Sequence, residues 1–275
     1  MTRLSHLLPA VLCTVLASSV LPISAQQWAK DKLEQSSRHR EYVTLTHDNR
    51  KVNAFVAYPE VKDKAPVVVL VHEIFGLSDW MKLEADELAA RGYIVVVPDL
   101  VSGVGPNGGG TDALFATSGS TDAVVKAVTS QAEAQVMADL GAAADYGKKL
   151  PSANGRLYVA GFCWGGGKSF DFATHRRDLS AAFVFYGPPP PTADMAKINV
   201  PVYGFYAGND ARIGATVPQT VIDMKAAGKR YEPVTYDGAG HGFMRAGQAP
   251  DSKPADHKAW SEATERLLKA MQPTS

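Results

Sequence analysis

The sequence predicts an α/β fold in which helices cover both faces of a mostly parallel sheet. Predicted strands and helices alternate along most of the 275 residues, and such alternation is typical of parallel sheets built from strand–helix–strand units. The segment 66–71 is continuously apolar and rich in valine, as expected of a strand buried on both faces. No internal repeat or long linker divides the chain, so we expect one domain at 26–275.

Eight segments have the composition of strands, because apolar and β-branched residues dominate them and turn residues flank them. These predicted strands are 42–45, 53–58, 66–71, 93–97, 157–160, 181–186, 200–206 and 231–236. Helices are expected at 79–91, 121–150 (as one or two helices), 217–227 and 254–271, with a further helix after residue 163. The polar segment 26–40 is compatible with a short surface helix or with a loose lead-in.

Two segments are predicted to be loops. The four prolines at 188–191 cannot occupy the interior of a sheet. The glycine-rich segment 101–110 lacks the spacing of a dinucleotide-binding fingerprint, and no helix start follows it directly. We therefore expect a flexible loop near the mouth of a site there, rather than a phosphate-binding loop.

The composition is that of an ordinary globular protein. The chain has 45% hydrophobic and 20% charged residues, and 28 basic residues balance 28 acidic ones, which gives a formal net charge of zero. Nucleic acid is therefore not expected as a partner, because no basic run provides an electrostatic footprint. The histidines are too scattered to form a metal-binding set, so we expect neither a metal nor an organic cofactor.

The first 25 residues predict a secretory signal peptide rather than part of the fold. A short polar start precedes an almost wholly apolar stretch at 7–21, and Ala25 is a small residue at the expected cleavage point. The apolar stretch is shorter than the ~20 residues that a membrane-spanning helix needs, and it contains Pro9. We therefore expect an exported protein, periplasmic or secreted, with no membrane attachment after cleavage.

Cleavage would remove Cys13 and leave Cys163 as the only cysteine. Exported proteins usually use cysteines in disulfide pairs, so a lone thiol is better explained by reactivity, and it is also expected to be sensitive to oxidation. Cys163 lies between small residues in the segment 161–167, after an apolar run and before a helical pattern. This is the pattern of a nucleophile elbow with cysteine in place of serine. The alternative is a small buried hydrophobe whose glycine neighbours only form a turn.

Three further residues come shortly after predicted strands, and these are Glu73, Asp210 and His241. Binding sites in parallel sheets lie at the carboxyl ends of the strands. Taken singly, Asp210 and His241 are compatible with ordinary turn residues. Together with Cys163, they follow the order nucleophile, acid, histidine that α/β-hydrolase folds use. They therefore predict a triad in which histidine activates the thiol and aspartate orients the histidine.

Four ordered motifs make the chain similar to the dienelactone hydrolase family. They are VHEIFG at 71–76, GFCWGG at 161–166, GND at 208–210 and HGFMR at 241–245. The resemblance covers essentially the whole chain after the signal peptide. It implies an α/β-hydrolase fold and a catalytic triad of Cys163, His241 and Asp210. It also implies that Glu73 contacts the resting thiol and helps to remove its proton once substrate binds.

The fold also indicates where an oxyanion would be bound. Backbone N–H donors are expected on the residue after the nucleophile, Trp164, and on the loop after the third strand, at Ile74. The resemblance implies that Arg245 binds a substrate carboxylate, which a guanidinium can hold with two parallel hydrogen bonds. A solvated surface arginine is the alternative. Phe75 either lines the pocket or packs in the core.

Two departures from the family pattern concern the substrate. The small-lactone enzymes of the family carry a second arginine after the fourth strand, where this chain has 101–105 without arginine. Many members have serine where this chain has Gly242. Both changes remove polar contacts to a small anionic lactone, so dienelactone itself is not expected as the natural substrate. Arg212 is either a substitute for the missing arginine or a surface charge.

The sequence therefore predicts a thiol hydrolase that cleaves an ester or lactone bond through an acyl-enzyme. Its expected partner is a small ester or lactone, with a carboxylate as a further recognition group. An alternative is a non-catalytic protein that binds a small acid or senses oxidants through Cys163. A peptidase is a weaker alternative, because no segment indicates peptide binding. No feature of the sequence indicates an oligomeric state.

Overall fold

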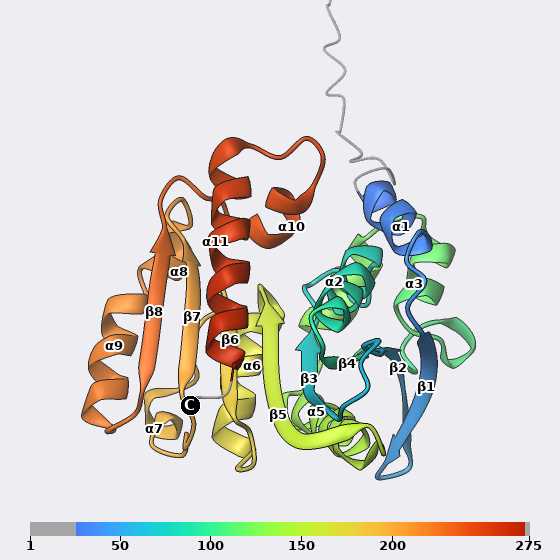
Figure 1. Cartoon of the computed structure of the whole chain (residues 1–275), viewed down its shortest axis with the longest axis horizontal. Coiled ribbons are helices and arrows are strands. Elements are labelled where there is room, and N and C mark those ends of the chain that lie inside the picture. Colours follow the sequence, from blue (N-terminus) through green and yellow to red (C-terminus); the bar gives the residue numbers. More distant parts are fainter. Residues whose placement is uncertain (1–25, 273–275) are drawn as a thin grey trace, which may run out of the picture.

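The computed structural model describes residues 26–272, so the predicted signal peptide at 1–25 lies outside the described residues. An eight-stranded sheet forms the centre of the described chain (Figure 1). Its strands are β1 (Arg40–His47), β2 (Arg50–Ala57), β3 (Ala65–Val71), β4 (Ile94–Pro98), β5 (Ala153–Phe162), β6 (Ala181–Phe185), β7 (Val202–Ala207) and β8 (Tyr231–Tyr236). Their order across the sheet is β1-β2-β4-β3-β5-β6-β7-β8.

The sheet is mostly parallel, as predicted. Strand β2 pairs antiparallel with both β1 and β4, whereas the neighbouring pairs from β4–β3 to β7–β8 are all parallel. Parallel neighbours need crossover connections, and here helices supply them. The fold class that the sequence predicts is therefore confirmed.

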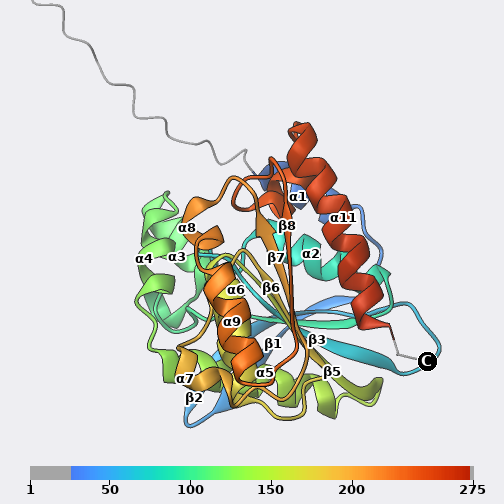
Figure 2. The same cartoon turned by 90° about the vertical axis from the view of Figure 1, so that its left-hand side faces the viewer.

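Helices lie on both faces of this sheet, with α11 on one side and α6 and α9 on the other in Figure 2. They are α1 (Gln27–Glu34), α2 (Asp79–Ala90), the 3-10 turn η2 (Pro106–Gly108), α3 (Thr111–Ser118), α4 (Asp122–Thr129), α5 (Glu133–Lys149), α6 (Trp164–His175), α7 (Thr192–Met195), α8 (Ala211–Gly214), α9 (Val217–Ala226), α10 (Phe243–Gln248) and α11 (Pro254–Met271). Within residues 26–272, no helix has both the length and the apolar composition that crossing a membrane requires.

Alternation along β3 explains how one sheet supports two cores. Val68 and Leu70 are fully buried in the core that includes side chains of α2 and α11, whereas Val67, Val69 and Val71 are fully buried in the core that includes those of α5 and α6. Successive side chains of a strand point to opposite faces, so a continuous apolar run is needed when both faces are covered. Burial of each such side chain stabilises the fold by roughly 1.5–3 kcal/mol.

The prediction that no helix directly follows the 101–110 segment is wrong, because α3 begins at Thr111. The Asp99 carboxylate accepts hydrogen bonds from the backbone N–H and the hydroxyl of Thr111, both at 2.8 Å. The residue before the helix is Gly110, which has no side chain to cap it. The cap therefore comes from the end of β4, and local sequence patterns do not reveal it. The beginning of the segment is also held, because the Ser102 hydroxyl donates to the Asp99 carbonyl at 2.6 Å.

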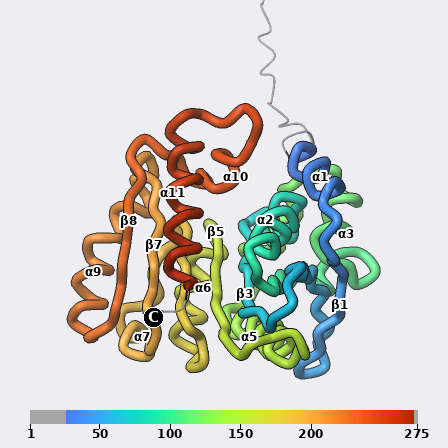
Figure 3. The backbone as a smooth tube through the Cα atoms, in the orientation of Figure 1, coloured from blue at the N-terminus to red at the C-terminus, as the bar shows by residue number. Residues whose placement is uncertain are grey.

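The carboxyl ends of the parallel strands bring the predicted functional residues to one edge of the sheet. Glu73 follows β3, Cys163 follows β5 directly, Asp210 follows β7, and His241 lies in the loop between β8 and α10. Figure 3 traces the chain from these strands into the loops and helices that follow them. Residues far apart in the sequence therefore meet at this edge, as expected for binding sites in parallel sheets.

We expect that replacing Glu84 with glutamine will stabilise the protein at pH 8 and have little effect at pH 4. Burial inside the fold raises the pKa of Glu84 to about 7 from an ordinary value of 4.5, and the charge of Glu87 adds to the rise. Between these values the folded protein binds more protons than the unfolded chain, so stability falls as the pH rises. The gain at pH 8 is as much as about 3 kcal/mol.

Urea unfolding of both proteins from pH 4 to pH 8 measures this effect, with Glu262→Gln as a control at an exposed side chain on α11. Equal stability differences at pH 4 and pH 8 would contradict the prediction.

Candidate active site

The elbow at Cys163 has the strained backbone that the sequence pattern predicts. Its φ of 57° and ψ of −118° lie in a region that non-glycine residues rarely adopt. The close approach of β5 and α6 requires small residues on both sides of Cys163. A Cβ on Gly161 would lie 2.0 Å from the Gly165 carbonyl oxygen, and one on Gly165 would lie 2.4 Å from the carbonyl oxygens of Val71 and His72. The strand and helix can therefore meet only if these positions lack side chains.

The groups around the Cys163 thiol shift its pKa in opposite directions. Burial raises the pKa of Cys163, and the negative charge of Glu73 raises it further. Hydrogen bonding from the backbone N–H groups of Trp164 and Ile74, and the positive charge of Arg212, lower the pKa but do not cancel the rise. The two predicted oxyanion donors thus lie at the sulfur atom, and the resting thiol is held in its protonated form.

His241 is paired with Asp210, as predicted. Its Nδ1 lies 2.5 Å from Oδ2 of Asp210, whose side chain is largely buried at the end of β7. The other carboxylate oxygen accepts the backbone N–H of Ile213 at 3.2 Å and so caps α8. Both oxygens of Asp210 are therefore engaged, which fixes the orientation of the carboxylate. Within the described residues, the side-chain hydrogen bond of the His241 ring runs to Asp210, and none runs to the Cys163 thiol.

Glu73 and Arg245 form a partly shielded ion pair beside the thiol. The Arg245 Nε donates to Glu73 Oε2 at 2.9 Å, and the Glu73 side chain is only 2% exposed. The guanidinium also lies over the ring of Phe75, with 5.4 Å between the guanidinium carbon and the ring centroid. Arg245 is therefore held by two predicted site residues and is not a freely solvated surface arginine. Its 29% exposure leaves it reachable from solvent.

Tyr186 lies in the site although the sequence does not single it out. It follows β6 with a φ of 41°, and its ring centroid lies 5.0 Å from that of His241. The side chain is fully buried, and among the described residues its hydroxyl has no hydrogen-bond partner. Burial raises the pKa of Tyr186 strongly, and the charge of Glu73 adds to the rise, so the hydroxyl stays protonated. An aromatic residue at the end of a strand is not distinctive, so the sequence does not indicate that Tyr186 lies in the site.

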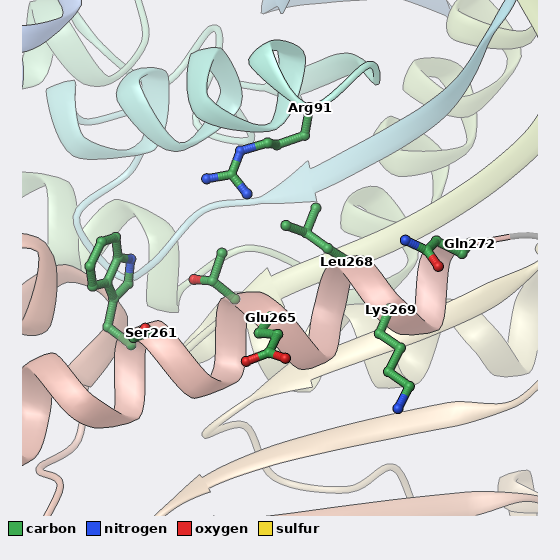
Figure 4. A pocket seen from close by; sticks show the side chains of 8 residues that line it. Arg91, Ser261, Glu265, Leu268, Lys269 and Gln272 are labelled. Atoms are coloured by element: carbon green, nitrogen blue, oxygen red, sulfur yellow. The ribbon is translucent and has the colours of Figure 1, made fainter.

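A surface groove of about 560 Å³ lies elsewhere, along α11 (Figure 4). None of its lining residues is a predicted site residue; they are Arg91, Trp260, Ser261, Thr264, Glu265, Leu268, Lys269 and Gln272. Within residues 26–272, no group of three or more His, Cys, Asp or Glu side chains is arranged to hold a metal ion.

We expect that Glu73→Gln will increase the reactivity of the Cys163 thiol at neutral pH. The substitution removes the negative charge that helps to raise the thiol pKa, so the thiolate fraction at pH 7 increases. The rate of alkylation by iodoacetamide should then rise several-fold at pH 7, and its pH midpoint should move to lower pH. Glu265→Gln, at an exposed site on α11, serves as the control. A midpoint that moves to higher pH would contradict the prediction.

Sheet topology and elbow geometry together place the chain among the α/β-hydrolases. The sequence profile of the dienelactone hydrolase family matches residues 52–271. A relative from Salmonella typhi, provisionally named a carboxymethylenebutenolidase, is 32% identical over 218 residues, which cover 75% of this chain and 76% of the relative. An Escherichia coli K12 relative with the same provisional name is 29% identical over 233 residues, covering 80% and 82% of the two chains. This chain belongs to the dienelactone hydrolase family, whose members are hydrolases of the ester- and lactone-cleaving class.

Solved structures show the same fold. A provisionally assigned dienelactone hydrolase from Klebsiella pneumoniae superposes with a TM-score of 0.70 at 25% identity, covering 85% of this chain and 98% of that one. A dienelactone-hydrolase-like promiscuous phosphotriesterase from metagenomic libraries gives a TM-score of 0.67 at 21% identity, covering 85% and 98%. The second likeness concerns the fold alone.

Proposed function

We propose that the protein hydrolyses a small ester or lactone through a covalent acyl-enzyme on Cys163. The observation that carries this proposal is the strained elbow, where the thiol meets the backbone N–H groups of Trp164 and Ile74. Such donors are worth most where negative charge develops on the carbonyl oxygen of the transition state. The pair of His241 and Asp210 at the same edge of the sheet supplies the base and its orienting group.

The reaction proceeds in two steps. The Cys163 thiol gives its proton to Nε2 of His241, because Nδ1 is held by Asp210, and the sulfur forms a bond to the acyl carbon. The leaving alkoxide takes the proton back from His241 as the C–O bond breaks. Water then attacks the thioester, gives its proton to His241, and the acid is released as the sulfur regains a proton. No organic cofactor or metal ion enters this sequence.

Glu73 and Arg245 link substrate binding to activation of the thiol. In the resting state the Arg245 guanidinium is occupied by Glu73. A substrate carboxylate that binds Arg245 competes with Glu73 for this guanidinium. The Glu73 carboxylate, once released from Arg245, then helps to remove the thiol proton, which ends on Nε2 of His241. The positive charge of Arg212 acts on the thiol as well, so Arg212 is a second group for an anionic substrate. We also propose export, on the basis of the signal-peptide pattern at 1–25.

The test uses purified protein with p-nitrophenyl acetate and a small panel of neutral and carboxylate-bearing lactones. Mass spectrometry of a rapidly acid-quenched reaction should show an acyl adduct on the peptide that contains Cys163. Product release that is equal in the wild type, Cys163→Ala and a protein-free blank would overturn the proposal.

We expect Arg245→Lys to weaken the binding of anionic substrates selectively. Lysine keeps the positive charge beside Glu73 but loses the planar fork that grips a carboxylate. KM for the half-ester p-nitrophenyl hydrogen succinate should rise by about 10-fold, whereas KM for the neutral p-nitrophenyl acetate should change by less than about 2-fold. Arg177→Lys, at an exposed arginine whose guanidinium binds the Lys197 carbonyl, is the control. Equal increases for both esters would exclude carboxylate recognition by Arg245.

A further inference from the structure

His72 connects the two loops at the carboxyl ends of β3 and β4. Its side chain is fully buried. Nδ1 lies 2.8 Å from the Glu73 carbonyl oxygen, and Nε2 lies 3.3 Å from the backbone nitrogen of Leu100, which donates to it. A carbonyl only accepts and a backbone N–H only donates, so both bonds form only if Nδ1 carries the proton and Nε2 does not. Burial lowers the pKa of His72, although the charge of Asp99 acts in the opposite direction, and the ring stays neutral.

The carbonyl that His72 holds belongs to the same peptide group as the Ile74 N–H. Because a trans peptide is planar, its C=O and N–H point in opposite directions and cannot rotate independently. A hydrogen bond that fixes the Glu73 carbonyl on one side therefore fixes the Ile74 N–H on the other, toward Cys163. The Gly76 N–H donates a second hydrogen bond to the Glu73 carbonyl at 3.1 Å. His72 therefore provides one of the two hydrogen bonds that fix this peptide group.

The second predicted oxyanion donor also contacts His72. The Trp164 ring stacks on the His72 ring with 5.7 Å between centroids and 15° between planes. Behind them, the start of α6 is so close to the His72 backbone that a Cβ on Gly165 would lie 2.4 Å from its carbonyl oxygen. His72 therefore contacts the peptide group that carries the Ile74 N–H. It also contacts the side chain of Trp164, whose backbone N–H is the other predicted oxyanion donor.

We infer that His72 is a positioning residue, whose neutral ring holds the Glu73–Ile74 peptide so that its N–H faces the oxyanion of the reacting carbonyl. This inference rests on the proposed function, in which that N–H stabilises the transition state. Removal of an oxyanion donor costs about 10²- to 10³-fold in turnover in other enzymes. Because Gly76 retains a second bond to the carbonyl, the loss of the His72 bond should cost less than removal of the donor.

The test compares His72→Phe with His72→Gln. Phenylalanine keeps the aromatic ring that stacks on Trp164 but removes both hydrogen bonds, whereas the glutamine amide can both donate and accept. For p-nitrophenyl acetate, kcat of His72→Phe should fall by about 10- to 100-fold, with KM changed by less than about 3-fold. His72→Gln should retain kcat within about 5-fold of the wild type.

Alkylation of Cys163 by iodoacetamide separates positioning from general damage, because this reaction develops no oxyanion. The limiting alkylation rate of His72→Phe at high pH, where the thiol is fully ionised, should stay within about 2-fold of the wild type. The pH midpoint of alkylation should move upward, because the Ile74 N–H that lowers the thiol pKa is no longer held in place. The inference is overturned if the limiting alkylation rate falls in parallel with kcat, if His72→Gln is as impaired as His72→Phe, or if His72→Phe keeps full turnover. Should His72→Phe not fold, the comparison of His72→Gln with the shorter amide of His72→Asn decides, and equal kcat values overturn the inference. Wild-type turnover that does not depend on Cys163 would instead refute the proposed function.

Discussion

Replacement of Cys163 with alanine should lower ester hydrolysis by about 10⁴- to 10⁶-fold. The elbow presents this sulfur at the meeting point of two backbone N–H groups, and the described chain contains no other cysteine. Without the sulfur, no acyl-enzyme forms, and only binding and the oxyanion donors remain to favour attack by water. The measurement is kcat/KM for p-nitrophenyl acetate after subtraction of a protein-free blank.

His241→Ala and the double variant Cys163→Ala/His241→Ala sharpen this experiment. The effects of removing two members of one catalytic unit do not add, because the base has no function without the nucleophile. The double variant should therefore be no slower than the single cysteine variant. His175→Ala, at an exposed histidine on α6, is the matched control and should retain full activity. Additive losses in the double variant would show that Cys163 and His241 do not act as one unit.

Asp210→Asn should lower kcat/KM at neutral pH by about 10³- to 10⁴-fold without loss of the fold. The reason lies in the two bonds of the Asp210 carboxylate. Since Oδ1 accepts the Ile213 N–H at 3.2 Å, the oxygen of an asparagine would stay on that side and its NH₂ group would face Nδ1 of His241. The imidazole would then carry its proton on Nε2, and that nitrogen could not accept the proton of the thiol.

Thermal unfolding of Asp210→Asn is the first control, because the cap on α8 is retained and the midpoint should change little. Asp251→Asn, in the exposed loop before α11, is the second. The deficit of Asp210→Asn should also shrink at high pH, because the thiol ionises there without help from the base. Activity within about 10-fold of the wild type at pH 7 would contradict the assigned role of Asp210.

Much of the fold could be predicted because burial on both faces leaves a clear sequence signal. The β3 run is short and rich in β-branched valine, which favours a covered strand over a buried helix. Gly161 and Gly165 are required beside Cys163, because a Cβ at either position would collide with backbone atoms. The pairing of Asp210 with His241 was predictable for a related reason. Parallel strands bring their carboxyl ends to one edge, so chain order and strand ends together define which residues meet.

The remainder depends on contacts that join distant parts of the chain. Helix α3 begins where Asp99 caps Thr111, and α10 has only six residues, too few for a periodic pattern. His72 looks like any residue at the end of a strand until its partners at Glu73 and Leu100 are known. Tyr186 depends on a positive φ that its side chain does not encode. Each of these features is a property of the assembled fold rather than of a local segment.

The raised thiol pKa affects how long the enzyme survives between encounters with substrate. Thiolates attack peroxides and disulfides far faster than thiols do, and burial together with the Glu73 charge keeps Cys163 protonated at rest. From the sequence alone, the lone cysteine predicts sensitivity to oxidation. In the folded protein, the sulfur that we propose as the nucleophile rests in its less reactive, protonated form, which slows its oxidation.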